Sequence, residues 1–129
     1  GFVADFVGEM NFLQGVLVAP DRVRVGATEL ACAPADGLPA GAPVCVCFRP
    51  EDVDVRGARA HTANTLEVQV VALDFLGSFY RVTLRPAAAD AADVRADVPV
   101  HLQREFALAP GQAITVSLPA DRVRVFPGA

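Results

Sequence analysis

Three cysteines and two histidines are the side chains of this sequence best suited to redox or metal chemistry. Cys45 and Cys47 are two positions apart, which places them on one face of a strand, where a disulfide between them would need distortion. Cys32, His61 and His101 add no C-x-x-C or H-x-x-x-H spacing of the kind that builds a tetrahedral metal site. We therefore expect no bound metal ion, and interpret the cysteines as small hydrophobic side chains of the core. Three thiols, which cannot all pair internally, indicate a reducing compartment.

The groups that could carry catalysis are equally sparse. All 11 basic residues are arginines, and without a lysine the chain cannot hold the phosphate-binding P-loop of ATPases. Ser78 and Ser117 are the only serines, and neither stands in a Gly-x-Ser-x-Gly motif, so Ser78 is expected in a structural turn. The adjacent carboxylates of Glu51 and Asp52 are expected to be solvated at a strand end. The sequence therefore predicts no catalytic and no cofactor-binding residue, and this chain is not expected to be an enzyme.

Composition disfavours further classes of protein. Hydrophobic residues make up 53% of the 129 positions, which is too many for a disordered segment. The apolar runs are short, whereas a membrane-spanning helix needs roughly 20 apolar residues in succession. The net charge is −4 and the arginines are spread singly, while nucleic-acid-binding proteins usually carry a basic face. We expect a soluble chain of one domain, or of two very small ones.

Alternation of apolar and polar residues predicts that the elements positioning these groups are mostly strands. Several segments alternate with a period of two: 22–25, 44–48, 66–70, 80–84, 114–118 and 122–125. Turns rich in proline and glycine separate them, a pattern typical of a small β-barrel or sandwich. Helices are expected at residues 2–7, as a short turn, and at residues 87–95, where a loop is the alternative.

A repeated pattern indicates that the strands form two related units. Residues 38–48, a turn followed by a strand, resemble residues 108–118 at an offset of 70. The pattern Asp-Phe-x-Gly at residues 5–8 returns at residues 74–77, at an offset of 69. The alternative is that any two valine-rich strand–turn segments look alike.

Four segments, taken in order, resemble the C-terminal part of the ATP-binding subunits of ABC importers for sugars, iron, polyamines and phosphonates. They are residues 2–13, the Phe-Arg-Pro-Glu-Asp-Val of 48–53, the Phe-Leu-Gly-Ser of 75–78 and the closing segment 118–126. That part is the TOBE domain, and the resemblance implies an all-β fold of two small OB-like β-barrel units. Residues 1–10 would then be the junction that follows a missing ATPase domain, and residues 11–129 the TOBE-type domain, with units at about 11–60 and 65–129. An exchange of strands between the units is left open.

The resemblance also implies a function. The chain would be the non-catalytic regulatory and dimerisation domain of a bacterial ABC transporter ATP-binding protein that takes part in solute import. It would be cytoplasmic, at the inner face of the plasma membrane, and would contact its own ATPase domain and the second ATPase subunit of a homodimer. The permease would be an indirect partner and a small regulatory ligand a further one, while ATP and magnesium would bind the missing ATPase domain. No nucleic acid is expected, and no residue indicates the transported solute.

Two strand ends provide the candidate interface or regulatory residues: Arg49, Glu51, Phe75, Gly77 and Ser78. Arg49 and Glu51 flank Pro50, which ends a strand because it has no N–H to donate. The alternative is that Arg49 and Glu51 merely clamp a turn. Gly77 is expected to permit a bulge or a positive φ. Phe12, Phe75 and Phe79 are expected in the core rather than stacked on a ligand.

Two other functions are weighed against this interpretation. A stand-alone small-oxyanion-binding protein of the molybdate-binding type would need backbone amides with Ser, Thr or Arg at a subunit junction, and this chain has few serines. A nucleic-acid-binding OB domain would need aromatic side chains on an exposed basic face. The acidic net charge and the absence of tryptophan speak against it.

Overall fold

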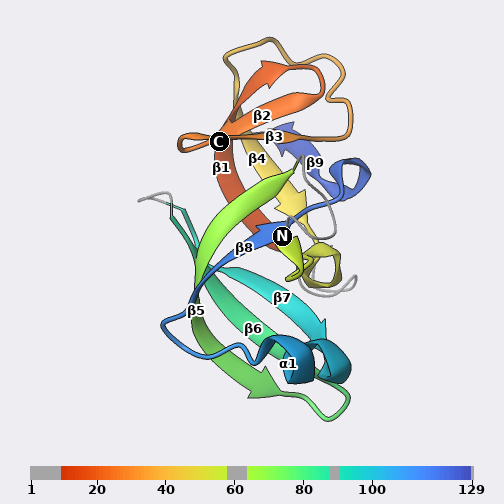
Figure 1. Cartoon of the computed structure of the whole chain (residues 1–129). Helices are drawn as coiled ribbons and strands as arrows, with labels where there is room; N and C mark the ends of the chain where they lie inside the picture. The colour runs from red at the N-terminus through yellow and green to blue at the C-terminus, as the bar shows by residue number, and fades with distance from the viewer. Residues whose placement is uncertain (1–9, 58–63, 88–90, 129) are drawn as a thin grey trace.

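Two antiparallel sheets make up the chain in the computed structural model, which describes residues 10–57, 64–87 and 91–128 (Figure 1). The first sheet has the strand order β3-β2-β1-β4-β9, and the second has the order β7-β6-β5-β8. The elements are β1 (Asn11–Ala19), β2 (Arg22–Val25), β3 (Thr28–Ala31), β4 (Pro43–Phe48), the 3₁₀ turn η2 (Pro50–Asp52), β5 (Thr65–Phe75), β6 (Phe79–Pro86), β7 (Val94–Pro99), α1 (Val100–Phe106), β8 (Ala113–Ser117), the 3₁₀ turn η4 (Ala120–Arg122) and β9 (Arg124–Pro127). The expected all-β fold of two small units is confirmed.

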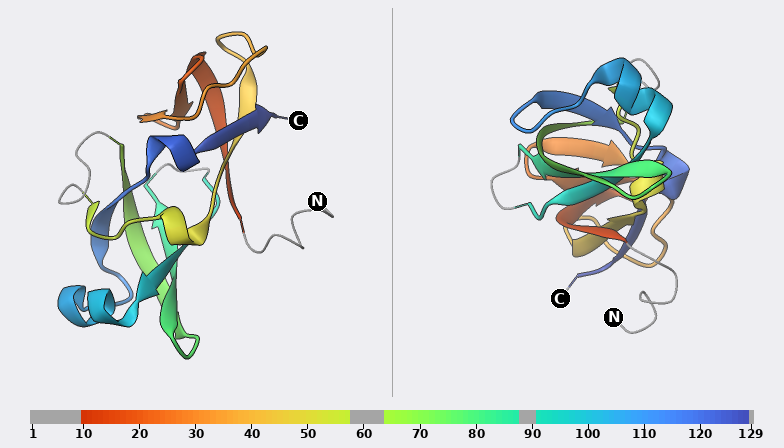
Figure 2. Two further views of the ribbon diagram at one scale, coloured as in Figure 1. Left: turned by 90° about the vertical axis from the view of Figure 1, so that its right-hand side faces the viewer. Right: turned by 90° about the horizontal axis from the view of Figure 1, so that it is seen from below.

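The last strand belongs to the first sheet, although it follows the second sheet in sequence. β9 pairs with β4, with Arg124 opposite Cys47, and in the left view of Figure 2 β9, in dark blue, lies in the same half of the molecule as the strands of the first sheet. In return Asp54, just after η2, forms an antiparallel bridge with Ser117 of β8 through two N–H···O bonds of 2.9 Å. Each unit thus lends the segment after its 3₁₀ turn to the other, so the strand exchange that the sequence left open is present.

The offset of 70 residues reappears in the backbone of the two units. β4 and β8 are each followed by a 3₁₀ turn, and η4 lies 70 positions after η2. Asp54 corresponds to Arg124 and Ser117 corresponds to Cys47 at this offset. The bridge between Asp54 and Ser117 therefore has its counterpart in the pairing of Arg124 with Cys47. The units are therefore related by an approximate two-fold symmetry, as the repeat of residues 38–48 in residues 108–118 predicts.

The second repeated pattern, Asp-Phe-x-Gly, does not belong to the structural repeat. Residues 5–8 lie outside the described residues, while residues 74–77 occupy the hairpin between β5 and β6. β1 and β5 correspond to each other, because each carries a register shift at matching positions, Leu17–Ala19 in one and Val70–Ala72 in the other. The β5–β6 hairpin is thus the counterpart of the β1–β2 hairpin, and the offset of 69 is not part of the structural repeat.

Two buried asparagines fasten the units to each other. Asn11 accepts a hydrogen bond from the N–H of Arg95 in β7 (2.8 Å) and donates one to its carbonyl (2.9 Å). Asn64, just before β5, makes the same pair of bonds with Ala31 of β3 (2.8 and 3.1 Å) and donates another to the carbonyl of Leu118 (2.8 Å). Both side chains are almost fully buried and imitate a backbone pairing with the other unit.

One hydrophobic core runs through both units. Its members point inward at alternate strand positions, as a period of two requires. They include Leu13, Leu17, Val23, Leu30, Val44, Val46 and Phe48 from the first sheet and Leu66, Val68, Val82, Leu84, Val94, Val98 and Val116 from the second. Because both sheets contribute side chains to one core, neither unit buries its apolar face alone.

The expectations about helices need correction. α1 forms where none was expected, and Leu102 and Phe106, four positions apart, pack its inner side against the core. Of the stretch 87–95, residues 88–90 lie outside the described residues, residues 91–93 are not helical, and β7 begins at Val94. The expected turn at residues 2–7 also falls outside them. No helix in the described part of the chain is long and apolar enough to cross a membrane.

The closing strand is displaced from its expected position at residues 122–125. Residues 120–122 form η4 instead, because the chain turns directly after Pro119, as it does at Pro50 in the first unit. β9 then begins at Arg124.

Candidate functional site

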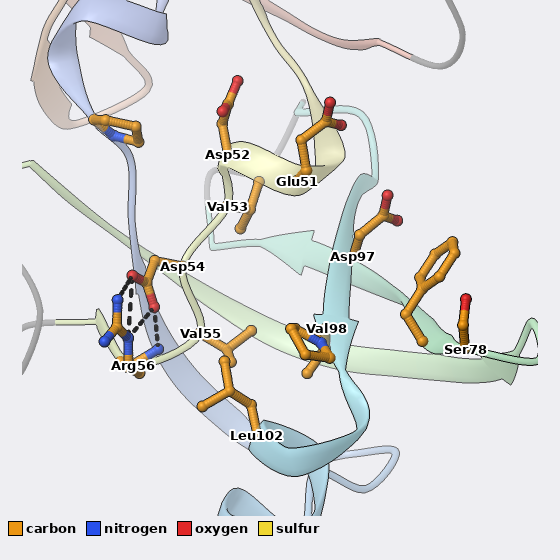
Figure 3. Close-up of a pocket in the computed structure, with 13 residues that line it drawn as sticks. Glu51, Asp52, Val53, Asp54, Val55, Arg56, Ser78, Asp97, Val98 and Leu102 are labelled. Atoms are coloured by element: carbon orange, nitrogen blue, oxygen red, sulfur yellow. Dashed lines mark hydrogen bonds and ion pairs between the residues drawn. The ribbon is translucent and has the colours of Figure 1, made fainter.

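A pocket of about 520 Å³ opens where the segment after η2 meets the second sheet (Figure 3). η2 and the exchanged segment supply one wall, the start of β6 and the end of β7 supply another, and α1 closes the end. The lining residues are Glu51, Asp52, Val53, Asp54, Val55, Arg56, Ser78, Phe79, Asp97, Val98, Pro99, Leu102 and Pro119. The pocket therefore exists only because the first unit lends residues 53–57 to the second.

The pocket is apolar at one end and acidic at the other. Figure 3 shows Val55, Val98 and Leu102 together, away from the carboxylates of Glu51 and Asp52 at the opposite end. Four carboxylates and one guanidinium line the pocket, and two of the carboxylates, Asp54 and Asp97, are paired with arginines. The exposed carboxylate of Glu51 can therefore receive a cationic group.

Ion pairs hold two of these carboxylates in place. Asp54 accepts hydrogen bonds from the Nη2 of Arg56 at 2.7 Å and from the backbone N–H of Arg56 at 2.9 Å, and this raises the pKa of the guanidinium. Asp97 accepts two hydrogen bonds from the guanidinium of Arg81 of β6, from Nε to Oδ1 at 2.9 Å and from Nη2 to Oδ2 at 3.2 Å. A two-point pair fixes the orientation of a carboxylate as well as its position. The Arg81 guanidinium also lies over the ring of Phe79, 5.6 Å from its centroid.

Burial acts on the carboxyl group of Asp52. Loss of water around this side chain raises its pKa above the ordinary value, although the nearby positive charges of Arg122 and Arg49 act in the opposite direction. Glu51, by contrast, is exposed. The sequence-based expectation that both neighbours are solvated therefore holds for Glu51 and is wrong for Asp52, because η2 turns their side chains to different surroundings.

The two units share a backbone plan and differ in charge at this place. Asp52 and Asp54 of the first unit correspond, at the offset of 70, to Arg122 and Arg124 of the second. The acidic pocket has no matching acidic counterpart among these paired positions. The approximate symmetry therefore holds for the backbone of the two units but not for the charges of these side chains.

The structure brings some of the predicted site residues together and leaves others apart. Glu51 and Ser78, predicted from separate motifs, line the same pocket. Arg49 precedes η2 and accepts the N–H of Asp52 with its backbone carbonyl (3.0 Å), but it does not line the pocket. Gly77 has φ of +97° with open space where a Cβ would stand, so the hairpin requires its conformational freedom, as expected.

The phenylalanines expected in the core are not there. Phe75 is 58% exposed at the β5–β6 hairpin, with its ring centroid 5.0 Å from that of Tyr80. Phe12 is 47% exposed, because the inward position next to it on β1 belongs to Leu13. Phe79 is half-buried against the pocket. An exposed aromatic side chain at a hairpin tip suits contact with another protein surface.

Sequence reasoning missed several residues of the pocket. Asp97, Arg56 and Leu102 come from segments that carry no motif, and only the strand exchange and α1 bring them beside Glu51. An available signal was the alternation of acidic and apolar residues from Asp52 to Val55.

Comparison with known proteins identifies relatives along nearly the whole chain. Residues 46–126 match the family described as the TOBE domain. The chain is 33% identical over 135 residues to the Fe(3+) ions import ATP-binding protein FbpC 2 of Rhizobium meliloti (strain 1021), covering 97% of this chain and 34% of that protein. It is 35% identical over 127 residues to the sulfate/thiosulfate import ATP-binding protein CysA 2 of Chromobacterium violaceum, covering 98% and 34%. With the spermidine/putrescine import ATP-binding protein PotA 1 of Pseudomonas aeruginosa the identity is 33% over 129 residues, covering 96% and 33%. The chain spans about a third of the length of these relatives.

A solved structure shares the fold. The cytoplasmic molybdate-binding protein ModG, in a crystal form with molybdate bound, matches with a TM-score of 0.76, covering 92% of this chain and 96% of that one. The sequence identity is 20%, so this likeness concerns the fold alone. The family match from residue 46 to residue 126 includes strands of both sheets and both 3₁₀ turns. The chain therefore belongs to the TOBE-domain family.

Proposed function

We propose that this chain is the non-catalytic C-terminal regulatory and dimerisation domain of a bacterial ABC importer ATP-binding subunit. The observation that carries the proposal is the match of 96–98% of the chain to about a third of three import ATP-binding proteins. The remaining two thirds of such a subunit would hold the ATPase domain, which would bind ATP and magnesium. The subunit would be cytoplasmic and would lie at the inner face of the membrane through its permease.

Regulation by such a domain requires a contact that exists in one global state of the ATPase pair and is lost in another. The acidic pocket with its exposed Glu51, and the hairpin with its exposed Phe75, offer two surfaces of different chemistry for that contact. Carboxylates around an apolar cavity suit a basic segment of the partner subunit, of the chain's own ATPase domain, or of a regulatory ligand. The exposed ring of Phe75 suits an apolar patch.

A small-oxyanion-binding function, the alternative, is supported by the fold shared with ModG. The lining of the acidic pocket weighs against it, because an oxyanion would face the carboxylates of Glu51, Asp52 and Asp97. Calorimetric titration of the chain with molybdate and with sulfate distinguishes the two functions. Saturable binding would favour the oxyanion function, and its absence is what the regulatory function predicts.

The regulatory function is tested in the intact ATP-binding subunit, reconstituted with its permease. Arg49→Ala, at a half-buried position, and Glu51→Gln, at an exposed one, should leave the fold intact, and the loss of the exposed Glu51 charge should cost about 1 kcal/mol or less. Both should change the solute-stimulated ATPase rate by about fivefold or more, the lower end of typical coupling between sites. Glu67→Gln, which neutralises an exposed carboxylate on β5 away from this pocket, is the matched control and should leave the rate unchanged. A lowered melting temperature with unchanged ATPase coupling would show that the strand end only clamps a turn.

A further inference from the structure

The two cysteines of β4 lie closer together than their positions in the sequence suggest. The sulfurs of Cys45 and Cys47 are 3.7 Å apart on one side of the strand, in contact but not bonded. Cys45 is half-buried and Cys47 is almost fully buried, while the third thiol, that of Cys32, is buried in the hydrophobic core. The pair therefore forms a dithiol, which is more than the two small hydrophobic side chains expected from the sequence.

The dithiol sits on the outer face of the first sheet, between two neighbouring strands. Phe12 of β1 and Arg124 of β9 lie opposite Cys47, and Phe126 of β9 lies opposite Cys45. Directly opposed residues of antiparallel strands point to the same face. Phe12 and Phe126 are 47% and 50% exposed, so two partly exposed aromatic side chains and a guanidinium surround the sulfurs. This setting is reachable from solvent through Cys45.

The fold itself does not require sulfur at these positions. At the offset of 70, Cys45 and Cys47 correspond to Thr115 and Ser117 of β8, which keep the same strand and the same bridge to an exchanged segment. Ser117 is fully buried, as its counterpart Cys47 nearly is. Side chains of this size therefore fit the strand without sulfur, although the Ser117 hydroxyl is buried without a hydrogen-bond partner. The thiols add a chemistry that the second unit lacks.

We propose that Cys45 and Cys47 form a bidentate thiolate site for a soft monovalent metal ion of the Cu(I) type. Thiolates are the soft ligands that Cu(I) prefers. No group of three or more metal-ligating side chains occurs in the described ranges of the chain, so two sulfurs suit a two-coordinate ion rather than tetrahedral zinc. Binding replaces both S–H bonds by S–Cu bonds, and two protons leave to solvent while copper keeps its oxidation state. The bis-thiolate product carries one negative charge, opposite the positive charge of Arg124.

The buried position of Cys47 does not suit a nucleophilic cysteine. Burial, together with the neighbouring Cys45 sulfur, raises the pKa of the Cys47 thiol to about 12. A thiol with so high a pKa is a poor nucleophile near neutral pH, which argues against a reactive or catalytic cysteine.

The test titrates the whole chain with Cu(I) under anaerobic, reducing conditions, in competition with a chromogenic Cu(I) chelator. We expect one equivalent per chain, an ultraviolet thiolate-to-copper absorption band, and protection of the half-buried Cys45 thiol from a thiol-modifying reagent. The double variant Cys45→Thr/Cys47→Ser, which copies the second unit's residues, should lose all of these signals, and its melting temperature shows whether it is folded. Cys32→Ser should keep them.

Single variants make the result decisive even if the double variant fails to fold. Cys45→Ser changes the half-buried thiol alone, and it should abolish the band because one sulfur cannot hold the ion by itself. Arg124→Gln should weaken Cu(I) binding about fivefold by removing the opposed charge. Unchanged Cu(I) affinity in Cys45→Ser, or one copper ion per two chains, would overturn the proposal.

Discussion

Replacing Asn64 by alanine should cost this fold about 3 kcal/mol, because three buried hydrogen bonds between the units disappear. The amide accepts from the N–H of Ala31 and donates to the carbonyls of Ala31 and Leu118, at 2.8, 3.1 and 2.8 Å. A typical intramolecular hydrogen bond contributes about 1 kcal/mol net, and groups left unpaired in a buried place cost more. A loss of about 3 kcal/mol lowers the melting temperature of a chain of this size by roughly 10 °C.

The approximate symmetry supplies a quantitative comparison. Asn11 makes two hydrogen bonds with Arg95, so Asn11→Ala should cost about 2 kcal/mol, less than Asn64→Ala. Because the two asparagines share no hydrogen-bond partner, their effects should add to within about 0.5 kcal/mol. Asn64→Asp keeps the shape but turns a carboxylate oxygen toward two carbonyls, and should cost at least as much as the alanine variant.

Urea unfolding followed by circular dichroism measures these free energies. Gln14→Ala is the matched control, because Gln14 is exposed on the same strand as Asn11 and should change stability by less than about 0.5 kcal/mol. Two results would refute the reasoning. One is an Asn64→Ala cost no larger than that of the control, and the other is a larger cost for Asn11→Ala than for Asn64→Ala.

Three further predictions concern two glycines, the carboxylate of Asp52 and nucleotide binding. Gly57→Ala should destabilise the fold severely, because its Cβ would collide with the Thr115 carbonyl oxygen, whereas Gly77→Ala, with open space and φ of +97°, should cost only about 1 kcal/mol in thermal unfolding. The raised pKa of Asp52 means that the native state holds a proton more tightly than the unfolded state, so the free energy of unfolding should fall as pH rises from the ordinary value of 3.8 through the higher native value. Asp52→Asn should remove that fall and raise stability at pH 7. Urea unfolding at several pH values measures this, and an equal dependence of the unfolding free energy on pH in the variant and the original chain would contradict it. Calorimetry at millimolar ATP should detect no saturable nucleotide binding by this chain, which has no lysine for a P-loop, and a saturable isotherm would be the contrary result.

Much of the strand pattern could be predicted from local sequence. The alternating segments around Val46 and Leu84 match β4 and β6, because a strand with one buried face must alternate with a period of two. The short helix α1 could not be predicted in the same way, since seven residues give too few turns for a helical period to stand out against the neighbouring strands. Alternation also cannot tell which face of a strand a phenylalanine takes when both faces carry apolar residues, which is why Phe12 was misplaced.

The candidate site was only half predictable. Glu51 and Ser78 could each be singled out as strand-end residues, but nothing in either motif indicated that they share a pocket. Asp97 enters that pocket from a strand that carries no motif of its own, and Arg56 enters it from the exchanged segment. Residues distant in sequence meet through long-range pairing, and the pairing partner of a strand is not encoded in its own pattern.

By itself, the sequence determined the β class, the repeat of 70 residues and the resemblance to the TOBE domain, because these depend on local periodicity, turn residues and motifs. The tertiary structure decided which edge each strand joins. Without β9 the two sheets would have four edge strands, β3, β4, β7 and β8. The place of β9 on β4 depends on the whole arrangement of the units, the asparagine hydrogen bonds and the shared core. That choice places Phe126 and Arg124 beside the dithiol, while the matching choice in the other direction, Asp54 bridged to Ser117, forms the pocket. Backbone pairing tolerates many sequences, so only the packed assembly distinguishes one edge from another.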